Sequence, residues 1–305
     1  MRAHVRVPCS TSNIGAGFDC VGMALDRWLV AEARLDAGAG AEPRLVRLGA
    51  LAVLGDAPAG DDLLVRGFAL ACADAGRAMP PGLRPEDTSE IPVARGLGSS
   101  AAALVARALL DDALLGLGLG AARVAELGAT EEGHPDNVAP MLFGGAVLGL
   151  PAGDGRWTFA PLPLHADVAA VVAIPEFHTS TKAMRGALPR ELPGGTAVRA
   201  GDRSPALVRG RTTGDRALQA HALDYLLHVP FRRALIPGYD AVVAAATAAG
   251  AWGATLSGAG SSLIALAPRG RAPAVADAVR PGWRAAGLAA EVWVAPVATA
   301  AQVGG

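Results

Sequence analysis

Lysine is almost absent from this chain of 305 residues, which has Lys182 as its single example. A Walker-type phosphate loop needs a lysine directly after its last glycine. Lys182 lies far from any glycine-rich turn, so the Walker arrangement is excluded. The other basic residues are arginines, the formal net charge is -1, and there is no basic stripe. This balance argues against nucleic acid as the main partner.

Cysteine is also scarce. Cys9, Cys20 and Cys72 are an odd number and form no CxxC pair, which excludes a disulfide framework and a cysteine zinc site. A reducing cytosol fits this composition best. The first seven residues alternate charged and apolar side chains and do not resemble a signal peptide. We therefore expect a cytoplasmic protein.

One long segment without charge, residues 242–267, raises the question of a membrane span. Four glycines and several serines interrupt it. A buried helix followed by a turn and a strand explains such a segment better, so we expect no membrane partner.

The length favours two domains, each large enough to bury a core. A polar, turn-like stretch at Asp154–Arg156 is the predicted boundary, giving domains 1–155 and 156–305. Helical and strand patterns are mixed in both halves, so the sequence predicts an α+β fold and not an all-parallel sheet.

Hydrophobic periodicity predicts the individual elements. The predicted strands are 4–8, 28–35, 143–150, 167–174, 252–256, 263–267 and 291–294. The predicted helices are 62–79, 99–117, 121–132, 181–188, 207–227, 239–249 and 272–279. Residues 189–205, rich in Pro, Gly and Arg, are predicted to be a mobile surface loop.

The stretch from Pro92 to Ala102 is the most informative motif. Its glycines, Gly96 and Gly98, allow main-chain N–H groups to approach an anion, and a predicted helix follows directly. The partial positive charge at the start of that helix points at the same place. The motif predicts binding of a nucleotide triphosphate, and the alternative is an ordinary helix cap after a glycine turn.

A dinucleotide-binding loop is a poorer explanation of this motif. Such a loop follows a strand and has an acidic residue about 20 residues further on. Here Ser99 and Ser100 follow the glycines, and the first acidic residues, Asp111 and Asp112, lie inside the predicted helix.

Three further segments carry polar groups suited to a ligand, and each has a plain structural alternative. The run Pro8–Asp19 presents Asn13 and Asp19, or is an Asx-type turn between strands. The segment from Glu126 to Asn137 presents a helical carboxylate and a histidine, or holds a solvated glutamate and a core histidine. The glycine-rich run Gly253–Ser262 permits close approach of a ligand, or is a glycine hairpin.

Taken in order, Pro8–Asp19, Pro92–Ala102 and Gly253–Ser262 resemble the three motifs of the small-molecule kinases that include galactokinase, homoserine kinase, mevalonate kinase and phosphomevalonate kinase (the GHMP kinases). Three other stretches resemble homoserine kinases within that superfamily. These stretches are Glu132–Pro140, Ser180–Arg185 and Pro230–Pro237. The resemblance implies an N-terminal domain like ribosomal protein S5 domain 2 and a C-terminal ferredoxin-like domain, with the active site in the cleft.

The resemblance also implies an activity, the transfer of the ATP γ-phosphoryl group to the side-chain hydroxyl of L-homoserine on the route to threonine. Two alternatives stay open. One is a kinase of the same superfamily for another small amino alcohol. The other is a non-catalytic relative that binds ligand as a sensor, against which the retained glycines, Ser100 and Glu126 argue.

For ATP and magnesium, the resemblance implies a first set of residues. The residues expected to bind the nucleotide phosphates are Pro92, Arg95, Gly96, Leu97, Gly98, Ser99 and Ser100. Mg²⁺ prefers hard oxygen ligands and accompanies ATP in kinases. Its implied protein ligands are Ser100 and Glu126.

For homoserine, the implied contacts are Asn13, Asp19, His134, Asn137, Thr181, Arg185 and Arg232. The two arginines suit the substrate carboxylate, and Asp19 suits its ammonium, with His134 as a possible neighbour. Asn13 and Asn137 are expected to orient the hydroxyl, and with Glu126 they form the expected catalytic set. No general base is assigned to the adjacent Asp136, because phosphoryl transfer relies on positioning and charge stabilisation.

Two positions depart from the family pattern. Ser261 stands where the third motif normally has proline, and Asp62 stands where relatives commonly have asparagine near the adenine. The first predicts a less rigid loop and the second an altered nucleotide preference. Relatives are often dimers, so a homodimer is also expected.

Overall fold

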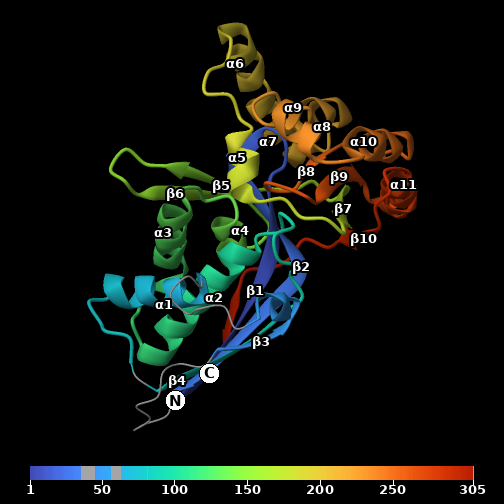
Figure 1. Cartoon of the computed structure of the whole chain (residues 1–305). Coiled ribbons are helices and arrows are strands. Elements are labelled where there is room, and N and C mark those ends of the chain that lie inside the picture. The colour runs from blue at the N-terminus through green and yellow to red at the C-terminus, as the bar shows by residue number, and fades with distance from the viewer. Residues whose placement is uncertain (36–44, 56–62, 81, 305) are drawn as a thin grey trace.

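The computed structural model describes residues 1–35, 45–55, 63–80 and 82–304. These residues form two antiparallel-rich sheets with helices packed on them (Figure 1). The first sheet has seven strands, in the order β11-β1-β2-β4-β3, with β5 paired to β2 and β6 paired to β5. The second has four strands in the order β10-β7-β9-β8. The predicted α+β class is confirmed.

The strands of the first sheet are β1 (Arg2–Asn13), β2 (Gly17–Leu35), β3 (Val46–Gly49), β4 (Leu83–Ser89), β5 (Ala146–Pro151), β6 (Trp157–Leu162) and β11 (Gln302–Gly304). The second sheet contains β7 (Val168–Pro175), β8 (Gly253–Leu256), β9 (Leu263–Pro268) and β10 (Ala290–Ala295). Short 3₁₀ helices cover Ala50–Leu54, Arg233–Leu235 and Arg269–Arg271.

The helices of the first half are α1 (Leu63–Asp74), α2 (Ser99–Leu115), α3 (Gly120–Glu132) and α4 (Val138–Phe143). Those of the second half are α5 (Thr181–Gly186), α6 (Gly194–Gly201), α7 (Arg203–Thr213), α8 (Arg216–Leu223), α9 (Val229–Arg232), α10 (Tyr239–Ala248) and α11 (Ala272–Ala285). Within the described residues, no helix is both long enough and apolar enough to cross a membrane.

The hairpin of β1 and β2 is the backbone of the first sheet, and both strands are longer than predicted. Their register runs from Arg2 opposite Arg34 to Asn13 opposite Gly17, with an irregularity between Pro8 and Cys9. Beyond Pro8 the polar sequence reads as a turn, yet it is buried strand, because helices and loops from both halves cover it. The hairpin turn therefore lies deep in the molecule.

Helix α2 packs against β1 and β2 on one side and against α1 and α3 on the other. Its alanine-rich sequence suits this position, because small side chains let a helix approach its neighbours closely on several faces. Most of its residues are buried. Packing on all sides therefore holds the start of this helix in place.

The predicted domain boundary at residues 155 and 156 falls in the turn between β5 and β6, which pair with each other in the first sheet. The chain leaves the first sheet after β6 and enters the second sheet at β7. After β10 it returns to the first sheet, where β11 pairs with β1. A division at this turn would separate paired strands, so we propose residues 163–167, between β6 and β7, as the boundary.

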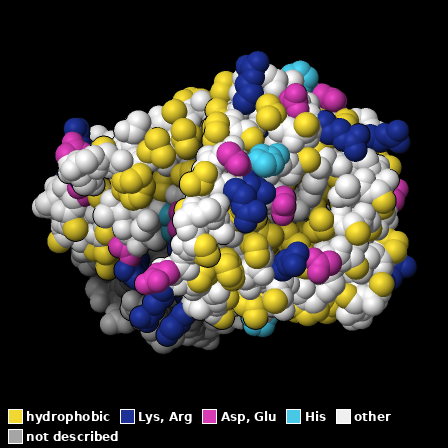
Figure 2. Space-filling view, turned by 90° about the horizontal axis from the view of Figure 1, so that it is seen from above, with side chains coloured by type: hydrophobic (Ala, Val, Ile, Leu, Met, Phe, Trp, Pro, Cys, Tyr) yellow, Lys and Arg dark blue, Asp and Glu magenta, His cyan; other side chains and the backbone are white. Residues whose placement is uncertain are grey.

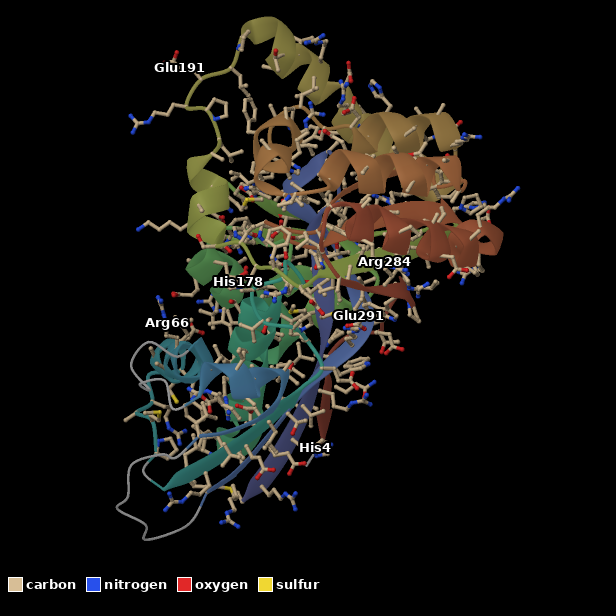
Figure 3. All side chains as sticks on the ribbon, turned by 45° about the vertical axis from the view of Figure 1, so that its right-hand side comes forward. His4, Arg66, His178, Glu191, Arg284 and Glu291 are labelled. Carbon is tan, nitrogen blue, oxygen red and sulfur yellow. The ribbon has the colours of Figure 1, made fainter. Side chains whose placement is uncertain are left out.

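Residues 189–205 contain α6 and the start of α7 instead of the predicted loop. The side chain of Arg203 donates to the carbonyl oxygens of Arg199 and Asp224, at 2.6 and 2.7 Å, and so ties α6 and α7 to the end of α8. This part of the chain stands out from the body in Figure 1, and Glu191 before α6 points outward in Figure 3. The uncharged segment 242–267 forms the end of α10 and strands β8 and β9, as predicted.

Acidic and basic side chains are interspersed on the face of the molecule that Figure 2 shows. Inside, one ion pair between Arg107 of α2 and Asp87 of β4 is almost completely buried. It joins the phosphate-loop helix to the first sheet. Breaking one side of a buried pair leaves an uncompensated charge.

We expect Arg107→Ala to lower the free energy of unfolding by about 3 to 5 kcal/mol, because the buried carboxylate of Asp87 would lose the guanidinium of Arg107. Urea unfolding measures this. Arg2→Ala is the control, since the pair of Arg2 with Glu32 is largely exposed and its loss should not change stability measurably. Equal effects of the two substitutions would contradict the role assigned to Arg107.

Candidate active site

The phosphate loop ends where α2 begins. Gly98 precedes the first helical residue, Ser99, and no side chain caps the first amides of the helix. Ser100 in the first turn is exposed. Uncapped amides together with the helix dipole form a site for an anion. The observed local structure is therefore the one that the motif predicts.

Two glycines of the loop are required by close backbone contacts. Gly96 and Gly98 have φ values of 75° and 69°, in the left-handed region. A Cβ atom on Gly96 would lie 2.1 Å from the carbonyl oxygen of Ser257, and one on Gly98 would lie 2.4 Å from Oγ of Ser10. Any side chain at either position would push the loop away from its neighbours.

Hydrogen bonds hold the loop against the other two motifs. Oγ of Ser257 donates to the Gly96 carbonyl at 2.6 Å, and the amide of Ser262 donates to the Arg95 carbonyl at 3.1 Å. From β1, the amide of Ser10 donates to the Leu97 carbonyl at 3.2 Å. The three motifs, far apart in sequence, meet at one place.

A cavity of about 330 Å³ opens at this junction. It brings together twelve of the residues singled out in the sequence, namely Asn13, Asp19, Arg95, Gly96, Gly98, Ser99, Ser100, His134, Asn137, Thr181, Arg185 and Arg232. Pro92, Leu97 and Glu126 are not among the described residues that line it. Leu97 is fully buried and anchors the loop in the core.

Arg185 of α5 and Asp19 of β2 form a two-pronged ion pair across the cavity wall. Nη1 and Nη2 of Arg185 donate to the two carboxylate oxygens of Asp19 at 3.1 and 3.0 Å. Both side chains are partly exposed. The two parallel hydrogen bonds show that this guanidinium is oriented to bind a carboxylate.

Arg232 of α9 is the buried cation of the site, with 2% of its surface exposed. Its Nε donates to the Met184 carbonyl at 3.2 Å, and its guanidinium lies 5.1 Å from the centre of the Phe18 ring. Its Nη1 has no hydrogen-bond partner. Burial, and then the charge of Arg185, lowers the pKa of Arg232 to about 10. An anion beside it would compensate this buried charge.

His134, Asp136 and Asn137 form a connected group beside Asp19, since ligand atoms of Asp19, His134 and Asp136 lie within 4.8 Å of one another. Nδ1 of His134 lies 2.7 Å from Oδ1 of the buried Asp136, and Nδ2 of Asn137 donates to the same oxygen at 3.3 Å. Burial opposes the charged form of His134, but the hydrogen bond to Asp136 and nearby carboxylates outweigh it and raise the pKa of His134. Asn137 also accepts from Oγ of Ser10 at 2.9 Å, so its amide orientation is fixed.

Asn13 lies at the end of β1 with a left-handed φ of 69°. Its Nδ2 donates to the Gly258 carbonyl at 2.8 Å, and its Oδ1 accepts from the amide of Asp19 at 3.0 Å. The side chain thus braces the first motif against the third. Its contact with a substrate hydroxyl stays a prediction.

The assignment of Glu126 as a magnesium ligand does not fit the structure. Its carboxylate pairs with Arg123 on the same helix at 2.7 Å, away from the cavity. Glu132, at the end of α3, lines the cavity instead. Glu132 lies six positions after Glu126, so the two side chains lie on different faces of the helix. The sequence signal for Glu132 was its place at the start of the Glu-Gly-His-Pro-Asp-Asn stretch.

Glu132 and Ser100 offer a carboxylate and a hydroxyl to the same cavity. Burial raises the pKa of Glu132 to about 7. The nearby charges have smaller effects on this pKa than burial does. A cation next to this carboxyl would favour its ionised form. Hard oxygen donors of this kind match the preference of Mg²⁺, so the residues present fit that ion.

Of the two unusual positions, Asp62 lies outside the described residues. Ser261 is buried, and its Oγ donates to the Phe177 carbonyl at 2.5 Å. This hydrogen bond attaches the third motif to the segment after β7. The predicted loss of rigidity is therefore opposed by a tertiary contact.

Comparison with known proteins agrees with this geometry. Residues 62–145 match the family model of the GHMP kinases N terminal domain, and residues 206–284 match that of the GHMP kinases C terminal domain. The homoserine kinase of Microchaete diplosiphon is 40% identical over 94% of this chain and 92% of its own length. That of a Synechococcus species is 39% identical over 98% of this chain and 96% of its own.

Solved structures give the same result. The homoserine kinase of Cytophaga hutchinsonii has a TM-score of 0.88 and 29% identity, covering 99% of this chain and 97% of that one. The Leishmania major mevalonate kinase complex with R-mevalonate has a TM-score of 0.69 at 15% identity, covers 96% of this chain and 95% of that one, and shows the shared fold. The matching domains, the similarity along nearly the whole chain and the meeting of the three motifs at one cavity lead to one conclusion: this chain belongs to the GHMP kinases and, within them, to the homoserine kinase family.

Proposed function

We propose that this enzyme transfers the γ-phosphoryl group of ATP to the side-chain hydroxyl of L-homoserine, forming O-phospho-L-homoserine. The observation that carries the proposal is the buried guanidinium of Arg232, a residue that lines the cavity and whose Nη1 has no hydrogen-bond partner. This positive charge calls for an anionic group on the substrate that receives the phosphoryl group. The same cavity contains the uncapped start of α2, which suits the nucleotide phosphates.

The two charges of homoserine match the charges of the site. Its carboxylate takes the open position on Arg232 and the guanidinium fork of Arg185. This releases Asp19 from Arg185, and the freed carboxylate accepts the substrate ammonium. The ion pair between Arg185 and Asp19 is thus exchanged for two ion pairs with the substrate. Thr181, at the start of α5, lines the same part of the cavity.

The nucleotide phosphates bind at the amides of Gly96 to Ser100, at the start of α2. Ser100 and Glu132 would hold Mg²⁺ there, with Glu132 in place of Glu126. When bound, the ion neutralises phosphate charge that builds up during transfer. Arg95, which also lines the cavity, adds a positive charge beside the loop.

The hydroxyl of the substrate is positioned by fixed hydrogen-bonding groups. Asn137 is held by Ser10 and Asp136, so its amide presents one orientation to the cavity. His134 is held in turn by Asp136. Positioning and charge stabilisation account for most catalysis of phosphoryl transfer, so no side chain has to act as a strong base.

Phosphorylation assays with homoserine, threonine, serine and mevalonate, each with ATP and Mg²⁺, test the proposed function. We expect homoserine to be the best acceptor, because mevalonate lacks an ammonium and serine and threonine place their hydroxyl on a shorter chain. Preference for another amino alcohol would identify a different member of the superfamily. No turnover of homoserine at millimolar concentration would disprove the assignment.

Arg232→Ala should weaken the use of homoserine, because the substrate carboxylate loses a charge-assisted hydrogen bond in a buried site. The expected loss in kcat/KM for homoserine corresponds to ~2 to 5 kcal/mol. The effect should appear mainly in KM for homoserine, with KM for ATP unchanged. Steady-state kinetics with each substrate varied in turn measure both. An unchanged KM for homoserine would show that the carboxylate binds elsewhere.

Glu132→Gln should reduce kcat by on the order of 100-fold and raise the Mg²⁺ concentration required, because a charged oxygen ligand is lost. Glu126→Gln is the matched control, on the same helix with the same change of charge, and should leave both values unchanged. Titration of activity with Mg²⁺ at saturating ATP and homoserine distinguishes them. The opposite ranking of the two variants would restore Glu126 as the ligand.

Two further predictions concern the whole protein. A homodimer is proposed on the resemblance alone, and light scattering after size-exclusion chromatography tests it. The cytoplasm is the proposed location, supported by the scarcity of cysteine.

A further inference from the structure

We propose that His228 is a positioning residue for the substrate pocket. It joins the turn between β1 and β2, which is flanked by Asn13 and Asp19, to α9, which carries Arg232. This inference rests on the proposed function, because these side chains are the proposed contacts of the substrate. His228 belongs to none of the motifs identified in the sequence, and it is not among the described residues that line the cavity.

His228 contacts the turn through its side chain. The residue is fully buried, and its Nε2 lies 3.3 Å from the Gly15 carbonyl oxygen. Its ring stacks on Phe18, with ring centres 4.8 Å apart and an angle of 24° between the planes. Tyr225 packs on it at 5.7 Å. The side chain therefore holds two points of the same turn, one by a hydrogen bond and one by ring stacking.

The protonation state of His228 suits this role. Burial, and then the charge of Arg232, lowers its pKa to about 3, so the ring is neutral near neutral pH. A neutral imidazole has one N–H group. Because the Gly15 carbonyl is an acceptor and Nδ1 has no partner, the proton belongs on Nε2. The ring is thus a single, directed donor to the turn.

The backbone of His228 fixes the other side of the pocket. Its carbonyl accepts from the amide of Arg232 at 3.0 Å and from the amide of Phe231 at 3.2 Å. Helix α9 has only four residues, so the position of its last residue depends on these first bonds. The guanidinium of Arg232 also contacts Phe18, the ring on which His228 stacks. One residue therefore sets the distance between the turn and the guanidinium.

The turn needs external support. Asn13, Ile14 and Asp19 have positive φ values of 69°, 40° and 56°. Asparagine and aspartate tolerate this conformation, but in the β-branched Ile14 it persists only when the surroundings enforce it. Two other contacts come from the same helical region. The amide of Ala16 donates to the Ala222 carbonyl at 2.9 Å, and Ser204 donates to the Ala16 carbonyl at 3.3 Å. His228 is the member of this set that also reaches Arg232.

The consequence is a selective effect on one substrate. A shift between the turn and α9 changes the spacing of Asp19 and Arg232, which receive the ammonium and the carboxylate of homoserine. The phosphate loop is attached elsewhere, to Ser10, Ser257 and Ser262. Loss of the His228 contacts should therefore weaken homoserine binding and leave ATP binding intact.

Two polar variants of different reach test the proposal, His228→Gln and His228→Asn. The amide nitrogen of glutamine reaches the place of Nε2, and that of asparagine is too short to reach the Gly15 carbonyl. We expect His228→Asn to raise KM for homoserine by about tenfold, the scale of one buried hydrogen bond. His228→Gln should recover most of this loss, and KM for ATP should change in neither variant.

A third variant, His228→Phe, keeps ring stacking and removes the donor, and should resemble His228→Asn. His221→Gln is the control, because His221 is exposed and pairs with Asp202 at the surface; its kinetics should equal those of the wild type. Thermal unfolding of each variant identifies any that does not fold. Among the folded variants, the KM values for homoserine of His228→Gln and His228→Asn are then compared to decide whether the hydrogen bond positions the turn.

The proposal is overturned if the glutamine and asparagine variants have equal KM values for homoserine. It is also overturned if KM for ATP rises in parallel, since that is the result of a general structural role. The wild-type assay separates this test from the proposed function. A wild-type enzyme that does not phosphorylate homoserine contradicts the proposed function alone, and the variants are then compared with the acceptor that it does use.

Discussion

The meeting of three backbone segments at the end of β1 is the constraint on which the rest of the site depends. The phosphate loop, the last residues of β1 and the loop after β8 approach so closely that main-chain atoms bond directly between them. Only glycine fits at Gly96, because any Cβ would collide with the Ser257 carbonyl. The anion site at the start of α2 exists because this packing holds the loop in place.

A second feature follows from charge. Among the arginines that line the cavity, Arg185 is paired with Asp19, and the buried Arg232 has an Nη1 without a hydrogen-bond partner. A buried cation without an anion is costly, and its retention is understandable where a ligand supplies the missing charge. The buried charge of Arg232 thus lowers the stability of the folded protein at this cavity. Such unfavourable features are common at binding sites.

The turn between β1 and β2 connects the two features. It belongs to the first sheet, yet the second half of the chain holds it: Ser204 and His228 bond its carbonyl groups, and the Ala222 carbonyl accepts from the amide of Ala16. The residues that line the cavity therefore come from both halves of the chain, and His228 is proposed to set their relative placement. A binding site between two layers gains its shape from the way the layers pack.

Much of the fold could be predicted from the sequence. Helices α2 and α3 follow from uninterrupted apolar periodicity, and β7 and β9 from short apolar runs between turns. The predictions failed where tertiary contacts override local pattern. Polar residues 9–13 form a buried strand because other elements cover them, and residues 189–205 form helices because Arg203 ties them to α8.

The candidate site shows the same division. The sequence by itself determined the loop that binds an anion, because glycines and a helix start act locally, and it indicated the family through the order of its motifs. Only the tertiary structure decided which carboxylate faces that loop. Glu126 and Glu132 lie on one helix, and the packing of α3 against its neighbours turns the second toward the cavity and the first toward Arg123. It also decided that His228 joins the two sides of the pocket, since residues more than 200 positions apart meet only after the halves pack together.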